Sequence, residues 1–137
     1  MSRFQPPPDR LVFELALTPG PLDIDENGHV NNVIYLRWVQ EIATAHWKSR
    51  VEAEEAARWA WVVARHEIDY RKPLHLGEQA TARTWVGAPQ GARFDRFVTI
   101  EGPEGLCAQA RSDWVLLDAA RRRPVRIPPE ILRPFLL

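Results

Sequence analysis

The spacing of apolar side chains changes abruptly along this chain, and that change limits the folds it can adopt. Over residues 32–50 they recur every three or four positions, as on one face of a helix. The residues of that face are Leu36, Val39, Ala43 and Trp47. From Trp59 onward the spacing shortens to two, which is typical of strands. No second helix-like segment separates the later strands, so the pattern predicts an antiparallel sheet packed on one helix.

Five segments are predicted to be strands, with turn sequences between them. The strands are expected at residues 11–18, 59–70, 79–87, 92–101 and 106–118. Turns are expected at PGP (19–21), at Gly77, at APQG (88–91) and at GPEG (102–105). The charged segment 51–58 and the arginine- and proline-rich tail 121–135 are expected to lie on the surface. The predicted fold class is α+β, with a five-stranded antiparallel sheet wrapped around one long helix.

Length and composition favour one domain over residues 1–137. Residues 1–10 form an extended lead-in, because QPPPD cannot supply a row of N–H donors. Lysine plus arginine equal aspartate plus glutamate at 18 each, so no overall field draws the chain to nucleic acid. No apolar run approaches the roughly 20 residues that span a bilayer, so no membrane partner is expected. The single cysteine, Cys107, and the lack of a signal-peptide pattern suit a cytoplasmic location.

The polar stretch DIDENGHVNN (23–32) joins the first strand to the helix and begins like a calcium-binding loop. The first requirements of an EF-hand are met by Asp23, Asp25, Asn27 and Gly28. Position 12 of that template is Ile34, which has no oxygen to offer, and the PGP turn stands where the entering helix belongs. We therefore expect no metal at this loop.

The same loop carries a D-x-N-x-H-V-N-N motif over residues 25–32. This motif, placed between a short strand and a long helix that is followed by four strands, resembles the hotdog-fold thioesterases over nearly the whole chain. PLHLGE (73–78) resembles the elbow after the family's second strand, and RPVRIPPEI (123–131) resembles its closing segment. The resemblance implies a hotdog fold and the hydrolysis of acyl thioesters, with acyl-CoA as substrate and without a cofactor.

The resemblance also implies roles for single residues. In the acyl-carrier-protein thioesterase branch the matching residues are implicated in catalysis, which points to Asp25, Asn27 and His29. In the 4-hydroxybenzoyl-CoA thioesterase branch, a match on Gly28 and Tyr35 also places the catalytic aspartate at Asp25.

Two departures from these patterns leave the carrier open. Where the first branch has a glutamate after its second strand, this chain has Lys72 and Pro73. Where the second branch has an aromatic residue, this chain has Asn32. Coenzyme A and acyl-carrier protein both remain candidate carriers, and the identity of the acyl group is not specified.

Thioester cleavage needs a base or nucleophile at the carbonyl carbon and donors for the developing oxyanion. Asp25 can activate water or attack directly, Asn27 can hold Asp25, and His29 can protonate the departing thiolate. The start of the helix offers N–H groups near Asn32 and Val33. Substrate contacts are expected from Gly28, Asn31, Asn32, Val33, Tyr35, Arg71 and Lys72, the last two toward the phosphates of coenzyme A.

A sheet around one helix leaves an edge and an apolar face uncovered, so we expect a homodimer, or a homotetramer built as a dimer of dimers. Two other functions fit the sequence: a hotdog hydratase or dehydratase, and a module that binds acyl-CoA without cleaving it. The Asp25 carboxylate favours cleavage, because a binder has no use for a base aimed at the thioester. Glu41, His66 and Cys107 are interpreted as structural, with Cys107 on the polar face of its strand.

Overall fold

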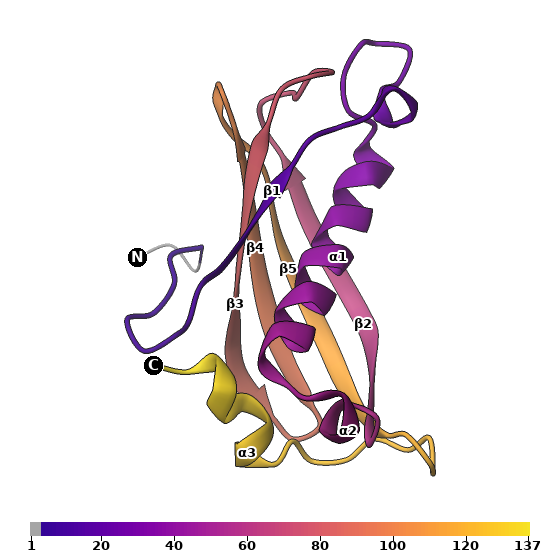
Figure 1. Cartoon of the computed structure of the whole chain (residues 1–137), viewed down its shortest axis with the longest axis vertical. Coiled ribbons are helices and arrows are strands. Elements are labelled where there is room, and N and C mark those ends of the chain that lie inside the picture. Colours follow the sequence, from indigo (N-terminus) through magenta and orange to yellow (C-terminus); the bar gives the residue numbers. More distant parts are fainter. Residues whose placement is uncertain (1–3) are drawn as a thin grey trace.

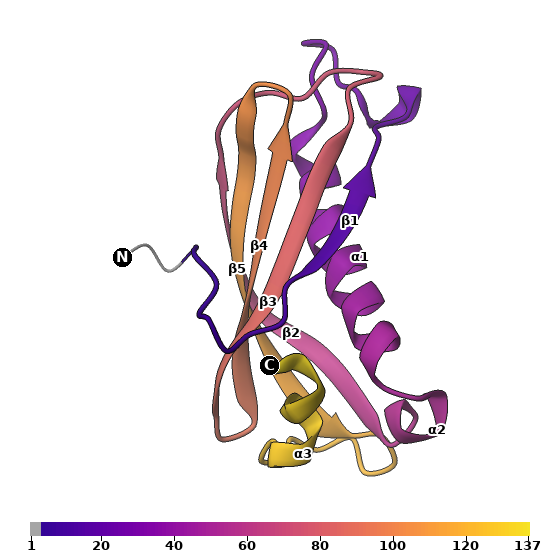
Figure 2. The same cartoon turned by 60° about the vertical axis from the view of Figure 1, so that its left-hand side comes forward.

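The computed structural model describes residues 4–137 and shows an antiparallel five-stranded sheet in the order β1-β3-β4-β5-β2 (Figure 1). The strands are β1 (Phe13–Leu17), β2 (Trp59–Tyr70), β3 (Ala80–Gln90), β4 (Arg93–Gly102) and β5 (Gly105–Asp118). One long helix, α1 (Asn32–Arg50), lies along one face of the sheet, as the two views agree (Figure 2). Short helices are η1 (Pro21–Asp23), α2 (Ala53–Ala56), α3 (Pro129–Leu132) and η2 (Arg133–Phe135). The predicted fold class is confirmed.

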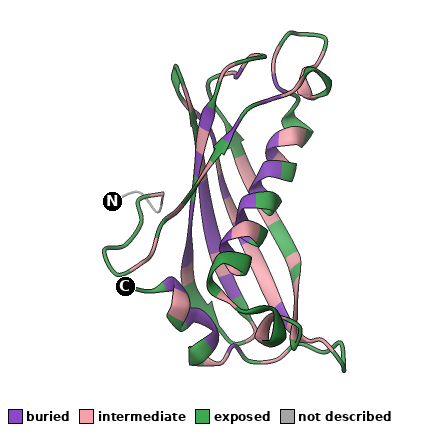
Figure 3. Ribbon diagram, in the orientation of Figure 1, coloured by how far each residue is buried: buried purple, intermediate pink, exposed green. Residues whose placement is uncertain are grey.

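Helix α1 has the bounds that the sequence predicted. Asn31 caps its first turn, where the Asn31 side chain accepts a hydrogen bond from the Val33 N–H. Its buried residues are Tyr35, Trp38, Val39, Ile42, Ala43 and His46. This face is centred about one position before the predicted one, since Leu36 and Trp47 are only half-buried. The buried residues of α1 lie on its side toward the sheet (Figure 3). Small side chains in the shared core, Ala80, Ala82, Ala108 and Ala110, allow these bulky residues to pack against the sheet.

The β3–β4 hairpin closes later than the sequence predicted. Strand β3 continues through APQG as far as Gln90, which pairs with Arg93. Gly91, with φ of 63°, makes the turn in a backbone region that glycine tolerates at little cost. The β3–β4 register shifts before Pro89, which is how a residue without an N–H can sit inside a ladder.

The C-terminal tail was predicted to lie on the surface, and this prediction was wrong. Ile127, Ile131, Leu132 and Phe135 are buried and form a second core cluster with residues of the sheet. Their spacing of four, one and three residues is that of a helical face, which the intervening arginines and prolines obscure in the sequence. The tail also pairs with the lead-in, because the Leu137 N–H donates to the Asp9 carbonyl at 2.9 Å. The first three residues of the expected lead-in lie outside the described part of the chain.

A polar cluster is buried between α1 and the sheet. Arg96 donates through Nη1 to Nδ1 of His46 at 2.9 Å and to Oγ1 of Thr84 at 3.1 Å. The Thr84 hydroxyl in turn donates to the Phe97 carbonyl at 2.8 Å. Burial, with the nearby Arg96 charge, lowers the pKa of His46 to about 3, so the ring is neutral and accepts a hydrogen bond from Arg96.

We predict that His46 makes the fold sensitive to acid. The pKa of His46 lies below the 6.5 of an ordinary histidine, so the unfolded chain takes up this proton first as pH falls. Its contribution to stability is therefore full above about pH 6.5 and declines toward pH 3. Between pH 7 and pH 5 this one group lowers the free energy of unfolding by about 2 kcal/mol.

Urea unfolding at both pH values, at one protein concentration, measures this loss. His46→Asn keeps an acceptor for Arg96 but does not titrate, so the variant should lose about 2 kcal/mol less than the wild type over the same interval. Equal losses in the two proteins would show that His46 does not carry the acid sensitivity.

Candidate active site

A compact polar loop precedes α1 at the upper end of the molecule (Figure 1). Ile24 and Val30 form an antiparallel bridge, so the chain turns back on itself between them. Within the turn, the Asp25 N–H donates to the His29 carbonyl at 2.8 Å, and the Gly28 N–H donates to the Asp25 carbonyl at 3.0 Å. Gly28 has φ of 80°, which explains why this position needs glycine.

The Asp25 carboxylate is fixed by the backbone of its own loop. Its Oδ1 atom accepts the N–H of Asn27 at 2.9 Å and the N–H of His29 at 3.4 Å. The side chain is half-buried, whereas Asn27 is exposed. Asn27 therefore holds Asp25 through its backbone, and Asp25 is the acceptor of an Asx-turn.

The Asp25 loop leads directly into α1 and is closed at its base by backbone hydrogen bonds. The Asn31 N–H donates to the Asp23 carbonyl at 2.8 Å, directly beside the Ile24–Val30 bridge. The Val33 N–H is engaged by the Asn31 side chain at a long 3.3 Å. The Asn32 N–H has no hydrogen-bond partner among residues 4–137, and it carries part of the positive end of the helix dipole.

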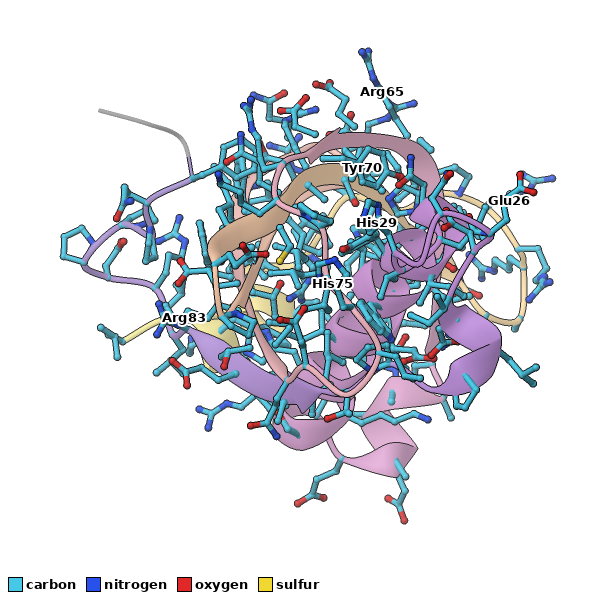
Figure 4. All side chains as sticks on the ribbon, turned by 90° about the horizontal axis from the view of Figure 1, so that it is seen from above. Glu26, His29, Arg65, Tyr70, His75 and Arg83 are labelled. Atoms are coloured by element: carbon cyan, nitrogen blue, oxygen red, sulfur yellow. The ribbon has the colours of Figure 1, made fainter. Side chains whose placement is uncertain are left out.

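A second histidine, which the sequence did not single out, accompanies His29. The rings of His29 and His75 meet edge to face with centroids 5.1 Å apart (Figure 4). His75 is oriented by Glu78, whose Oε1 atom lies 2.8 Å from the ring Nδ1 and 2.7 Å from the backbone N of His75. These hydrogen bonds, that of the backbone first, lower the pKa of the Glu78 carboxyl. The signal in the sequence is the HLGE turn, where Gly77 at φ of 81° brings residues three apart together.

The end of β2 joins the same site. The Tyr70 hydroxyl donates to the Asn32 carbonyl at 3.2 Å, which links this strand to the first turn of α1. Arg71 and Lys72 follow with exposed side chains, and their N–H groups bond to the carbonyls of Cys107 and Leu106. The loop, the helix start and the cationic segment after β2 thus meet at one end of the sheet.

Comparison with known proteins identifies the family of this chain. A model of the thioesterase-like superfamily matches residues 19–135. The chain belongs to the thioesterase-like superfamily. The matched residues include the whole Asp25 loop and most of both core clusters.

Solved structures support the assignment of the superfamily's hotdog fold. A predicted thioesterase from Bacillus stearothermophilus is 25% identical, with a TM-score of 0.82 over 91% of this chain and 94% of that chain. The hypothetical protein SAV2348 from Staphylococcus aureus, solved in complex with CoA, is 16% identical, with a TM-score of 0.81 over 95% and 85%. A thioesterase from Thermus thermophilus, complexed with coenzyme A and Zn, is 21% identical, with a TM-score of 0.79 over 89% and 90%. No curated protein sequence matches the chain significantly.

In this member of the superfamily, Tyr35, one of the predicted substrate contacts, is buried. Its ring is 3% exposed and packs between Trp38 and Tyr70, with centroids 5.5 and 5.6 Å away. Burial raises the pKa of Tyr35 to about 12, so the phenol is neutral. Tyr35 belongs to the same core cluster as Val30 of the loop. The other predicted substrate contacts are exposed: Gly28, Asn31, Asn32, Val33, Arg71 and Lys72.

Other titratable residues of the chain have structural partners. Glu41 pairs with Arg37 on the exposed side of α1, and His66 Nδ1 lies 2.6 Å from the Ser112 hydroxyl. Cys107 is 2% exposed in the core, so its predicted position on the polar face was wrong. The thiol of Cys107 is buried because Leu74 covers it: both side chains lie close to Gly102 and belong to one core cluster.

Among residues 4–137, no cluster of three metal-ligating side chains occurs, and no helix is long and apolar enough to cross a membrane.

Proposed function

We propose that the protein hydrolyses acyl-CoA thioesters, with Asp25 as general base or nucleophile. The observation that carries this proposal is the Asp25 carboxylate, fixed by two backbone N–H groups beside an unpaired N–H at the start of α1. A carboxylate can activate the attacking group, and a preorganised N–H can stabilise an oxyanion. Membership of the thioesterase-like superfamily supports the same reaction class.

In the general-base route, Asp25 accepts a proton from water as the water oxygen bonds to the thioester carbonyl carbon. The carbonyl oxygen becomes an oxyanion, for which the Asn32 N–H is the candidate donor. The C–S bond then breaks, the carboxylic acid forms, and the coenzyme A thiolate takes up a proton, for which His29 is the candidate donor. In the nucleophilic route, Asp25 attacks the carbon itself, the C–S bond breaks and the protonated thiol of coenzyme A leaves. Water later cleaves the resulting mixed anhydride to the carboxylic acid and restores the Asp25 carboxylate.

The surroundings of Asp25 suit an amphipathic thioester. Leu22, Val33, Tyr70 and Leu76 are among the most exposed large hydrophobic residues of the described chain, and they come from the segments that meet at this end. We propose that these residues contact the pantetheine arm, while Arg71 and Lys72 contact the phosphates of coenzyme A. Two of the similar solved structures contain coenzyme A, which supports coenzyme A as a carrier, whereas two others are acyl-ACP thioesterases.

Release of free thiol from a panel of aryl, short-chain and long-chain acyl-CoAs tests this function. We expect turnover with at least one class, and a loss of about 100-fold or more when the Asp25 carboxylate is removed. If the wild type binds coenzyme A but leaves every thioester of the panel intact, the chain is a binding module.

We also propose that two copies pair through β2 into a continuous sheet. Strands β1 and β2 are the edges of the sheet, and β2 is more than twice as long, with 12 residues against 5. A long unpaired edge is a template for a second chain. Because Tyr70 ties the end of β2 to Asn32, pairing there would bring the second copy close to the site.

Sedimentation tests the pairing. We expect the wild type to sediment as a dimer or larger, against a chain mass of 15.8 kDa. Val62 lies on β2 and is 44% exposed, so Val62→Lys should weaken association by about tenfold or more, because a charge at the interface must be desolvated. Val12→Lys is the matched control near the opposite edge, since Val12 is 38% exposed just before β1. Dissociation caused by Val12→Lys alone would place the interface at β1 instead.

A further inference from the structure

A cavity of about 230 Å³ lies between the second half of α1, the sheet and the C-terminal helices, at the end of the molecule away from Asp25 (Figure 1). Its wall includes the indoles of Trp47, Trp59, Trp61 and Trp114 and the side chain of Arg96. Thr44, also in the wall, is exposed to solvent. An aromatic cavity of this kind is unlike an ordinary close-packed core.

The cation in this cavity has no matching anion. Arg96 is 4% exposed, and no carboxylate of residues 4–137 lies within 4.0 Å of its guanidinium. Its hydrogen-bond partners, His46 and Thr84, are neutral, and the rings of Phe94 and Phe135 lie 5.7 and 5.9 Å from its central carbon. Burial lowers the pKa of Arg96 to about 9, so it remains charged at neutral pH. A buried unpaired charge is costly, and buried charges are normally paired.

Another arginine of the same sheet, Arg111, is paired with anions. Its guanidinium forms ion pairs with Glu67, Asp95 and Asp113. Among residues 4–137, Arg96 in the cavity wall has no carboxylate partner, whereas Arg111 on the same sheet has three.

A second donor in the same wall is unsatisfied. The Nε1 atom of Trp114 is buried and has no hydrogen-bond partner among the described residues. Phe94 pairs with Trp114 and Arg96 pairs with Ser112, so the two donors lie two register positions apart on β4 and β5. A cation without an anion, beside an N–H without an acceptor, indicates that the missing component brings acceptor oxygens and negative charge.

We propose that this cavity binds a small apolar acid, whose carboxylate pairs with Arg96 and accepts the Trp114 N–H, while its apolar body packs among the tryptophans. The volume fits, because a cavity of about 150 Å³ holds one benzene ring. The ligand has two conceivable sources with the same chemistry: a free carboxylic acid, or a carboxylate at the far end of an acyl group. The second source rests on the proposed thioesterase function. Thr44 is twelve residues along α1 from Asn32, about 18 Å, so only a long acyl group would reach the cavity from the site of the same chain.

The test uses 2-naphthoate as probe and 2-naphthamide as a neutral compound of the same shape. Calorimetry gives the affinities, and the indole N–H resonances of the tryptophans report the place of binding. We expect naphthoate to bind and to shift the Trp114 resonance, which Trp114→Phe identifies by its loss. Arg96→Met should weaken naphthoate at least about tenfold and change naphthamide little, because only the charge-assisted contact is removed.

Two conservative variants test the proposal even if Arg96→Met does not fold. Trp114→Phe removes one N–H and keeps a ring, and should weaken naphthoate about fivefold. Trp85 also has a buried, unpartnered Nε1 atom but does not line this cavity, so Trp85→Phe should leave the affinity unchanged. The proposal is overturned if naphthoate does not bind at millimolar concentration, if it binds Arg96→Met as well as the wild type, or if the Trp114 resonance does not shift.

The source of the carboxylate is decided with two thioesters, dodecanedioyl-CoA and dodecanoyl-CoA. If Arg96→Met lowers kcat/KM for the first at least about tenfold more than for the second, the acid is part of the substrate. If kcat/KM falls equally for the two thioesters while naphthoate binding is lost, the cavity binds a free acid. Naphthoate binding should persist in Asp25→Asn, so a protein that cleaves no thioester would refute the proposed function and leave the cavity proposal standing on the binding data.

Discussion

Asp25→Asn is expected to lower kcat for acyl-CoA hydrolysis by about 100-fold or more, with little change in stability. Asparagine retains an oxygen that accepts the N–H groups of Asn27 and His29, so the loop should keep its turn. What the variant loses is the negative charge, and with it the ability to accept a proton from water or to form an acyl intermediate. Thiol release at saturating substrate measures the rate, and urea unfolding measures the stability.

Asp23→Asn is the matched control for this result. Asp23 lies in the same loop and is also an acceptor, for the Gly20 N–H at 2.9 Å and for Arg37 at 3.2 Å. Its substitution should leave kcat within about threefold of the wild type, because an exposed ion pair contributes little to the fold. Equal losses of activity in the two variants would indicate that the charge of the loop, and not Asp25 itself, supports hydrolysis.

Phe135→Ala is expected to lower the free energy of unfolding by about 3–5 kcal/mol. Phe135 is 1% exposed and anchors the tail on α1. Its ring stacks on Trp47 at 6.0 Å and meets His46 edge to face at 4.7 Å. Truncation removes these contacts and leaves a void against the buried Arg96 guanidinium, which lies 5.9 Å from the ring. Urea unfolding at one protein concentration measures the loss, since association also contributes to stability.

Leu137→Ala provides the comparison two residues away. Leu137 is 78% exposed, so its truncation should change stability by no more than about 0.5 kcal/mol. If Phe135→Ala were equally mild, the tail would be a surface segment, as the sequence had suggested, and the second core cluster would not depend on it.

Several features were predictable because short stretches of sequence determine them. The bounds of α1 follow from the three-to-four-residue spacing and from Asn31, whose side chain can cap only the turn directly after it. The turn around Asp25 is likewise local: the hydrogen bonds of the Asp25 carboxylate join residues no more than four apart, and Gly28 supplies the conformation that the turn needs. The motif therefore marked both the helix start and the candidate carboxylate.

What the tertiary structure decided depends on residues that are distant in the sequence. His75 faces His29 across 46 positions, and Arg96 meets His46 across 50, so no local pattern could pair them. The tail packs into the core because its apolar side chains cover apolar residues of β3, β4 and β5, and these strands form one surface only in the folded protein. Local sequence determined the helix and the turn around Asp25, since backbone and turn energies act between neighbours. The second histidine, the buried arginine and the cavity were decided by packing, since burial and unpaired charge arise only when separate segments come together.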